Sequence, residues 1–168
     1  MIRLALLLTF AVGACGPGIA GGPTMSNKIG AGAPKDLDGA QSAVVSADIL
    51  AREPLANTAM VKHILISWAD LADTFQGRQD ARATKRSKTD AETEIKALLG
   101  QIKAGGDFDK IMKENSEDKG SAMSGAPFKV TPDAGLVIEF RQLSLRLKLD
   151  EVGVCQSDFG FHIIKRYQ

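Results

Sequence analysis

The chain has 168 residues but only two histidines, and each lies in the middle of a run of aliphatic residues. His63 lies in the run 59–67, and His162 lies in the run 161–167. A metal centre needs three or four convergent ligands, so two histidines and one nearby carboxylate make a poor metal site. We therefore expect no metal and no cofactor. Two interpretations remain open from these residues alone: core histidines satisfied by backbone partners, or a pair that performs chemistry together.

The two cysteines, Cys15 and Cys155, are too few for a disulfide scaffold or a four-cysteine zinc site. Cys15 follows a short basic start and the apolar run 4–12. That run is too short to span a bilayer, which takes about 20 residues, but it suits the core of a signal peptide. The second cysteine, Cys155, is predicted to be a small buried residue of a strand.

The sequence Val-Gly-Ala-Cys that ends at Cys15 resembles the lipobox of bacterial lipoproteins. The resemblance implies that residues 1–14 are removed and that Cys15 is lipidated, so that its acyl chains anchor the protein in a lipid bilayer. Gly16 beside the cysteine, in place of Asp, favours the periplasmic face of the outer membrane of a bacterial envelope over the inner membrane. The alternative is an ordinary secretory signal with a chance cysteine.

The segment that follows is rich in small residues, with six Gly and three Pro between residues 16 and 34. Such a segment buries too little surface to offset the entropy of ordering it, so residues 15–57 are predicted to form a flexible tether. Residues 43–51 within it could form a short helix that ends before Pro54. The folded domain is then expected over residues 58–168.

The charge balance argues against one class of partner. The chain carries 21 Lys and Arg against 20 Asp and Glu, for a net charge of +1. Nucleic-acid binding depends largely on phosphate neutralisation, so we expect no nucleic-acid partner.

The elements that must position the histidines can be read from hydrophobic periodicity and capping signals. Thr89 and Glu92 have the spacing of a capping box, and Gly105 follows the last apolar position of that helix. The remaining predictions are a long loop at 68–89 and a loop at 116–132, with strands at 59–67, 128–130, 152–156 and 161–167, and further helices beginning at Asp107 and spanning 136–148. The order β-α-α-β-α-β-β indicates a small α+β domain around a mostly antiparallel sheet.

This order and four sequence landmarks resemble the parvulin-type peptidyl-prolyl cis/trans isomerases. The landmarks are the strand 61–65, the segment from Gly105 to Phe108, the segment 115–118 and the hairpin 157–164. The resemblance covers nearly all of residues 58–168. It implies a four-stranded sheet in which the two histidines lie on neighbouring central strands with their rings facing each other.

The resemblance also implies a set of functional residues. His63, His162 and Ser157 would form a polarised hydrogen-bond network, and Asp118 would tune that network and face the substrate carbonyl. The residues expected to contact the substrate are Phe128, Leu136, Phe140 and Phe159. Such a site would lower the barrier to rotation, about 18–20 kcal/mol, by binding the twisted imide better than either planar isomer.

The predicted function is therefore isomerisation of X-Pro bonds in exported, proline-containing polypeptides by a monomeric envelope folding factor. The stretch 124–128 departs from the glycine-rich loop of the family, which leaves an inactive chaperone or docking module as an alternative. A structural lipoprotein is a third interpretation. The stretch from Arg78 to Lys88 holds five basic residues and one acid. A solvated loop, or one facing acidic lipid headgroups, is favoured there over selection of phosphorylated substrates.

Overall fold

The computed structural model describes residues 41–168. The expected signal peptide, Cys15 and the tether up to residue 40 lie outside the described residues. The elements in chain order are α1 (Ala47–Leu50), β1 (Ala59–Ile66), the 3-10 helices η1 (Ala69–Phe75) and η2 (Ala83–Lys85), α2 (Lys88–Lys103), α3 (Phe108–Asn115), α4 (Lys119–Ser124), β2 (Phe128–Val130), α5 (Ile138–Arg146), β3 (Val152–Ser157) and β4 (Gly160–Arg166).

The four strands form one sheet in the order β2-β1-β4-β3, and every neighbouring pair is antiparallel. This confirms the predicted α+β fold and makes β1 and β4 the central strands. In their register His63 lies opposite Ile164, and Leu65 lies opposite His162. The two histidines are therefore diagonal neighbours on one face of the sheet, within reach of each other's rings.

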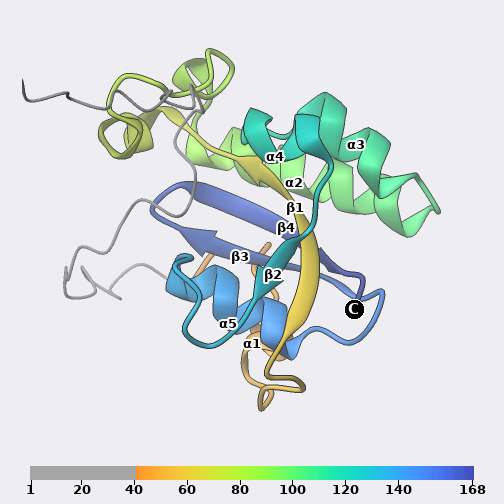
Figure 1. Ribbon diagram of the computed structural model, residues 1–168. Helices are drawn as coiled ribbons and strands as arrows, with labels where there is room; N and C mark the ends of the chain where they lie inside the picture. Colours follow the sequence, from red (N-terminus) through yellow and green to blue (C-terminus); the bar gives the residue numbers. More distant parts are fainter. Residues whose placement is uncertain (1–40) are drawn as a thin grey trace, which may run out of the picture.

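Helices cover both faces of the sheet. Figure 1 shows α2 and α3 on one side of the strands and α5 on the other. Because side chains alternate along a strand, β1 and β4 contribute to two separate cores. The core under α2 and α3 includes Ile64, Ile66, Phe161 and Ile163, whereas the core under α5 includes Val61, Phe140, Leu143, Cys155 and Ile164.

The folded unit begins before residue 58, because the segment around α1 packs against the sheet. Val44 and Val45 are buried in the core under α2, and Ile49 is buried in the core under α5. Ser46 binds the edge of β3: its backbone N–H donates to the Val154 carbonyl at 2.9 Å, and its hydroxyl accepts from the Val154 N–H at 3.0 Å. The segment thereby covers an open sheet edge. The short helix predicted within residues 43–51 is present as α1.

The capping box of α2 differs from the predicted one. Ser87, and not Thr89, is the N-cap: its hydroxyl accepts from the Asp90 N–H, and the Asp90 carboxylate accepts from the Ser87 N–H. The predicted capping box of Thr89 and Glu92 was wrong, because the helix begins one residue before Thr89 and its N-cap is Ser87. A shorter aspartate closes the same pair of bonds two residues earlier.

Two predicted loops contain helical turns. The stretch 68–89 includes η1 and η2, and the stretch 116–132 includes α4. The short helix α4 begins where the Asp118 carboxylate accepts from the Ser121 N–H at 3.3 Å. Conversely, the helix α5 is shorter than the predicted helix 136–148, because both Val137 and Leu147 have non-helical backbone angles.

The hairpin between β3 and β4 closes tightly, since Ser157 pairs directly with Gly160. Gly160 has a φ angle of 132°, and a Cβ atom there would collide with the backbone carbonyl of Ile66. Only glycine fits both the backbone angle and this close approach to β1. The turn therefore fixes the position of Ser157 relative to the central strands.

Candidate active site

The functional residues expected from the sequence form one continuous line of hydrogen-bonding contacts across β4 and β1. The Ser157 hydroxyl lies 2.7 Å from Nε2 of His162. Nδ1 of His162 lies 3.3 Å from Nδ1 of His63, whose Nε2 lies 3.0 Å from Oδ2 of Asp118. Both imidazoles are completely buried, and their ring centroids are 5.4 Å apart with the planes tilted by 30°. The structure thus brings together all four residues expected to be catalytic.

The protonation states give this line a direction. Burial, together with the neighbouring His63 ring, holds the pKa of His162 well below its usual value, so His162 is neutral. Burial tends to raise the pKa of Asp118, but the hydrogen bonds from His63 and Ser121 outweigh it and leave the pKa below its usual value. Asp118 is therefore a carboxylate and can only accept.

Only one arrangement of protons makes every contact a hydrogen bond with neutral rings. His63 donates from Nε2 to Asp118, so its Nδ1 is an acceptor. His162 then donates from Nδ1 to His63, and its Nε2 accepts from the Ser157 hydroxyl. Every donor in the chain points toward Asp118. Each hydrogen bond polarises the next, and the accumulated polarity falls on the Asp118 carboxylate.

Aromatic rings close the site on the side of α5. The Phe140 ring is fully buried and stands edge-on to both imidazoles, with centroid distances of 5.2 Å to His63 and 5.7 Å to His162. Phe128 of β2 lies 5.4 Å from His63 and 5.8 Å from Phe140. Phe128 and Leu136 are half-buried and pack against the same core. Phe128 and Phe140 thus lie beside the histidine pair, and Leu136 packs against the same core as they do.

Phe159, the fourth residue expected to contact the substrate, lies apart from this group. Its backbone N–H donates to the Ser157 hydroxyl at 3.1 Å, which links it to the hydrogen-bond chain. Its ring, however, is only 6% exposed and packs edge-on to Phe75, in a small cluster with Leu65. Through its backbone, Phe159 orients Ser157.

Sequence reasoning missed three polar residues that hold Asp118 in place. The Ser121 hydroxyl lies 3.3 Å from Nε2 of His63 and donates to the Asp118 carbonyl at 3.2 Å. Ser116 binds the main chain of β1 at Leu65, and Glu117 binds the main chain of Ser67, directly after β1. For Ser116 and Glu117 the only signal was their place in the family landmark at 115–118, and Ser121 lies beyond that landmark. Short polar residues of this kind show no periodicity.

The basic stretch from Arg78 to Lys88 is largely engaged inside the protein. Arg86 pairs with Glu94 and Glu117 at 2.8 and 2.6 Å, and Arg82 pairs with Asp80 at 3.2 Å. The Lys88 ammonium lies 5.7 Å from the centre of the Trp68 ring. Two of the five cations, Arg78 and Lys85, are exposed without an ion pair among the described residues. The excess positive charge therefore serves mainly to hold this loop together.

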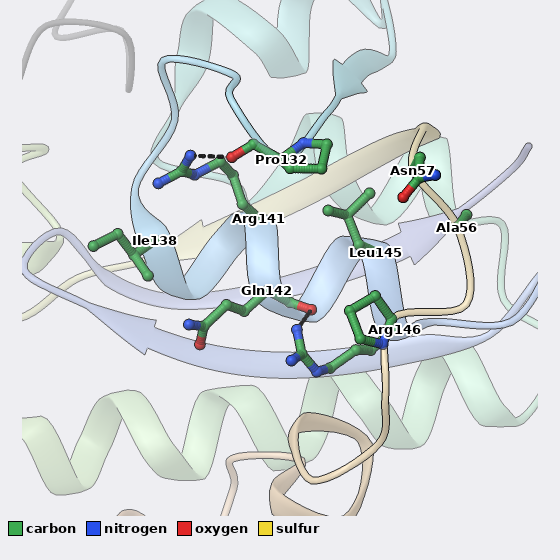
Figure 2. A pocket seen from close by; sticks show the side chains of 9 residues that line it. Ala56, Asn57, Pro132, Ile138, Arg141, Gln142, Leu145 and Arg146 are labelled. Atoms are coloured by element: carbon green, nitrogen blue, oxygen red, sulfur yellow. Dashed lines mark hydrogen bonds between the residues drawn. The ribbon is translucent and has the colours of Figure 1, made fainter.

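The structure has a cavity of about 280 Å³, but it lies away from the histidine pair. It is lined by residues of α5 together with Ala56 and Pro132, and Figure 2 shows Leu145 on the side of Ala56 and Arg141 reaching toward Pro132. The Arg141 guanidinium donates to the Pro132 carbonyl, and Arg146 donates to the Gln142 carbonyl at 3.0 Å. None of the expected site residues lines this cavity.

Cys155 is completely buried in β3, as predicted. Burial also raises the pKa of its thiol, which makes the thiol unreactive. Within residues 41–168, no three His, Cys, Asp or Glu side chains converge in a way that could hold a metal ion. No helix in that same part of the chain is both long and apolar enough to cross a membrane.

Comparison with known proteins places these features in one family. A family model described as the PPIC-type PPIase domain matches residues 48–167. The chain is 29% identical to the foldase protein PrsA of Geobacillus kaustophilus over 112 residues. The matched region covers 66% of this chain and 40% of that protein. The chain is also 36% identical over 78 residues to the periplasmic chaperone PpiD of Escherichia coli, covering 46% of this chain and 12% of that protein. The chain thus spans less than half the length of these relatives.

Solved structures agree on the fold. The peptidyl-prolyl isomerase ESS1 from Candida albicans superposes with a TM-score of 0.55 at 17% identity, covering 67% of this chain and 63% of that chain. TbPIN1 superposes with a TM-score of 0.57 at 20% identity, covering 68% of this chain and all of that chain. The family model, which covers most of the chain, and the hydrogen-bonded histidine pair lead to the same conclusion: the chain belongs to the PPIC-type, or parvulin, family of peptidyl-prolyl cis/trans isomerases.

Proposed function

We propose that this protein catalyses cis/trans isomerisation of X-Pro peptide bonds in exported polypeptides. The observation that carries the proposal is the directional hydrogen-bond chain from Ser157 through both histidines to Asp118, covered by Phe140. Membership of the PPIC-type family supports the same activity. Two relatives are named a foldase and a periplasmic chaperone, which supports a role in folding outside the cytoplasm.

The chemistry requires no cofactor and no covalent intermediate. The barrier to rotation, about 18–20 kcal/mol, arises from amide resonance, which is lost when the bond twists. A site that binds the twisted imide better than the planar one therefore accelerates the reaction, and each tenfold gain needs about 1.4 kcal/mol of preferential binding. Phe128 and Leu136 would contact the proline ring, with Phe140 beneath them. An apolar contact at the ring disfavours the charge-separated planar form of the amide.

Asp118 acts at the polar side of the site. Its carboxylate receives the polarity of the whole chain, and its side chain is 9% exposed. We assign it to face the carbonyl that precedes proline, where negative charge favours the twisted amide over the resonance form with a negative oxygen. His63, His162 and Ser157 hold and polarise Asp118 from below.

The activity is tested by exchange spectroscopy on a short proline-containing peptide in the presence of the purified protein. We expect cis/trans exchange to become faster than the uncatalysed reaction, which takes tens to hundreds of seconds. The variant with both His63→Ala and His162→Ala should lose the acceleration. A folded wild-type protein that leaves the exchange rate unchanged would rule out the enzyme.

A non-catalytic peptide-binding chaperone on the same fold is the second candidate. It is favoured by the complete burial of Phe140 and by the position of the cavity outside the site. This alternative predicts that the protein suppresses aggregation of an unfolded client and that the double histidine variant suppresses it equally. Loss of suppression in that variant would instead tie client binding to the histidine site.

The protein's location is part of the proposal and rests on the lipobox-like sequence at Cys15. Lipidation of Cys15 would attach the domain to the periplasmic face of the outer membrane through a tether. The Cys15→Ala variant, expressed in a Gram-negative cell, should then appear in the soluble fraction, whereas the wild-type chain sediments with membranes. Equal membrane retention of the two proteins would contradict lipid anchoring.

A further inference from the structure

One half of β1 lacks a neighbouring strand on its outer edge. The short strand β2 pairs only with residues 59–61, so the edge beside Leu65 and Ser67 is left to other groups. The Leu65 N–H donates to the Ser116 hydroxyl at 3.1 Å, and the Leu65 carbonyl accepts from the Glu117 N–H at 2.9 Å. The Ser67 N–H donates to a Glu117 carboxylate oxygen at 2.7 Å. Ser116 and Glu117 thus continue the edge where β2 has ended.

The Glu117 carboxylate is held from two sides. Its second oxygen accepts from the Arg86 guanidinium at 2.6 Å, and its side chain is only 1% exposed. Arg86 also donates to the Ser67 carbonyl at 2.8 Å and pairs with Glu94 of α2 at 2.8 Å. One guanidinium and one carboxylate therefore bind the same residue, Ser67, which directly follows β1, at its carbonyl and at its N–H.

This arrangement has a consequence for the next residue, Asp118. The main chain before Asp118 is fixed against Leu65 and Ser67, and the carboxylate of Asp118 is held at Oδ1 by the Ser121 N–H at 3.3 Å. Oδ2 is then left facing His63 at 3.0 Å. Leu65, which binds the segment 116–117, and His63, which binds the Asp118 carboxylate, lie on the same strand. One rigid element therefore holds both the segment and the partner of the carboxylate.

Arg82 adds a third support at the beginning of the same segment. Its guanidinium donates to the carbonyls of Glu114 and Ser116 at 3.4 and 3.3 Å. Arg82 is exposed, whereas the Arg86 side chain is only 10% exposed. Arg86 and Glu117 are therefore the buried centre of the arrangement, and Arg82 lies at its rim.

We propose that Glu117 and Arg86 are positioning residues for the isomerase site: their ion pair clamps the segment 116–118 onto the end of β1 and so sets the direction of the His63–Asp118 hydrogen bond. This proposal rests on the proposed function, because it assigns a task within the same site. A hydrophobic pair of similar volume often stabilises a fold as well as a buried ion pair does. The clamp instead provides directional bonds that place a carboxylate.

The chain contains a matched ion pair far from the site, which serves as the control. Glu151 accepts from Arg52 with both oxygens, at 2.9 and 2.8 Å, and also from the Lys148 N–H at 2.7 Å. Like Glu117, it therefore joins one guanidinium to one backbone N–H. It lies in the turn before β3 and touches none of the four residues of the hydrogen-bond chain.

The experiment compares Glu117→Gln with Glu151→Gln in the full chain. Thermal unfolding, the rate of peptide isomerisation per folded molecule and the ¹⁵N signals of the His63 ring are measured for each. We expect both variants to unfold at lower temperature. Only Glu117→Gln should shift the Nε2 signal of His63 and lower the rate, by about tenfold, since a displacement of about 1 Å can cost up to about a hundredfold. Equal rate losses in the two variants, or an unchanged His63 signal in Glu117→Gln, would overturn the proposal.

A second comparison separates positioning from any other effect of the substitution. In a chain that already carries Asp118→Asn, Glu117→Gln should lower the rate no further, because the two changes act through the same carboxylate. A full additional loss would overturn the clamp. If Glu117→Gln fails to fold, Arg86→Lys keeps the charge, loses the forked geometry and should give the same two signatures. The His63 signal tests the clamp even if the wild-type protein shows no isomerase activity.

Discussion

The two faces of the central strands are built from the same β1 and β4, yet they have opposite chemistry. The face under α2 presents Ile64, Ile66, Phe161 and Ile163, all of them buried. The face under α5 presents both histidines at the same depth, with no exposed surface on either ring. Burial stabilises the first face without regard to direction, whereas a buried imidazole costs free energy unless both of its nitrogens find partners.

The comparison shows how each face can be changed. The apolar face needs volume and shape, so conservative hydrophobic replacements should be tolerated there. The polar face needs particular atoms at particular places, since Ser157, His162, His63 and Asp118 satisfy one another in sequence. Substitutions on the two faces should therefore separate stability from activity.

The largest effect on stability is expected on the apolar face. Ile95 of α2 is completely buried there, and Ile95→Ala should lower the free energy of unfolding by about 2–5 kcal/mol through lost burial and a new cavity. The rate of isomerisation per folded molecule should stay the same. Urea denaturation and the peptide exchange assay measure the two quantities on one sample. A rate loss larger than the loss of folded protein would show that the two faces are not separable.

A smaller loss of stability, but a loss of activity, is expected on the polar face. Ser157→Ala leaves Nε2 of His162 and the Phe159 N–H without their partner, which should cost about 1–3 kcal/mol. The rate of isomerisation should fall because the hydrogen-bond chain has lost its first donor. Ser157→Thr retains the hydroxyl and is the matched control, with wild-type activity expected. Full activity in Ser157→Ala would show that the Ser157 hydroxyl does not contribute to catalysis.

The pH dependence of stability should arise from the polar face. The pKa of His162 lies well below its unfolded value of about 6.5, so below that pH the unfolded chain binds a proton that the folded chain refuses. Stability should therefore fall as the pH decreases from about 6.5, by up to about 1.4 kcal/mol per pH unit. The control is the His162→Gln variant, which keeps all the other titrating groups. The difference between the pH profiles of stability of the wild-type protein and this variant therefore isolates the contribution of His162. Parallel pH profiles would contradict a buried neutral His162.

The smallest effect is expected at the edge of the apolar layer. Ser87→Ala removes the N-cap of α2 and its reciprocal bond with Asp90, for a cost of about 1 kcal/mol. Activity should not change, because α2 does not face the histidines. The mid-point of thermal unfolding is the measurement, with the exposed Thr84→Ala as a reference. An unchanged mid-point would mean that the capping box does not contribute.

The sequence predicted those parts of the molecule that carry a periodic signal or a family landmark. The aliphatic runs around the two histidines located both central strands, and the family landmarks predicted the histidines, Ser157 and Asp118, which the structure brings into hydrogen-bonding contact. The short helix α4 was missed because its sequence contains polar and small residues without an apolar period, and a single cap at Asp118 starts it. Glu117 was missed for a different reason. Its burial depends on Arg86, 31 residues away in the sequence, and no local pattern records such a partner.

The most direct test of the polar face is the tautomeric state of its two histidines. Long-range ¹H–¹⁵N spectra of the protein at neutral pH distinguish a protonated ring nitrogen from a bare one. The hydrogen-bond chain predicts two neutral rings with opposite tautomers: His162 protonated on Nδ1 and His63 protonated on Nε2. A proton on Nε2 of His162, or a charged imidazolium at that position, would contradict a chain whose donors all point toward Asp118.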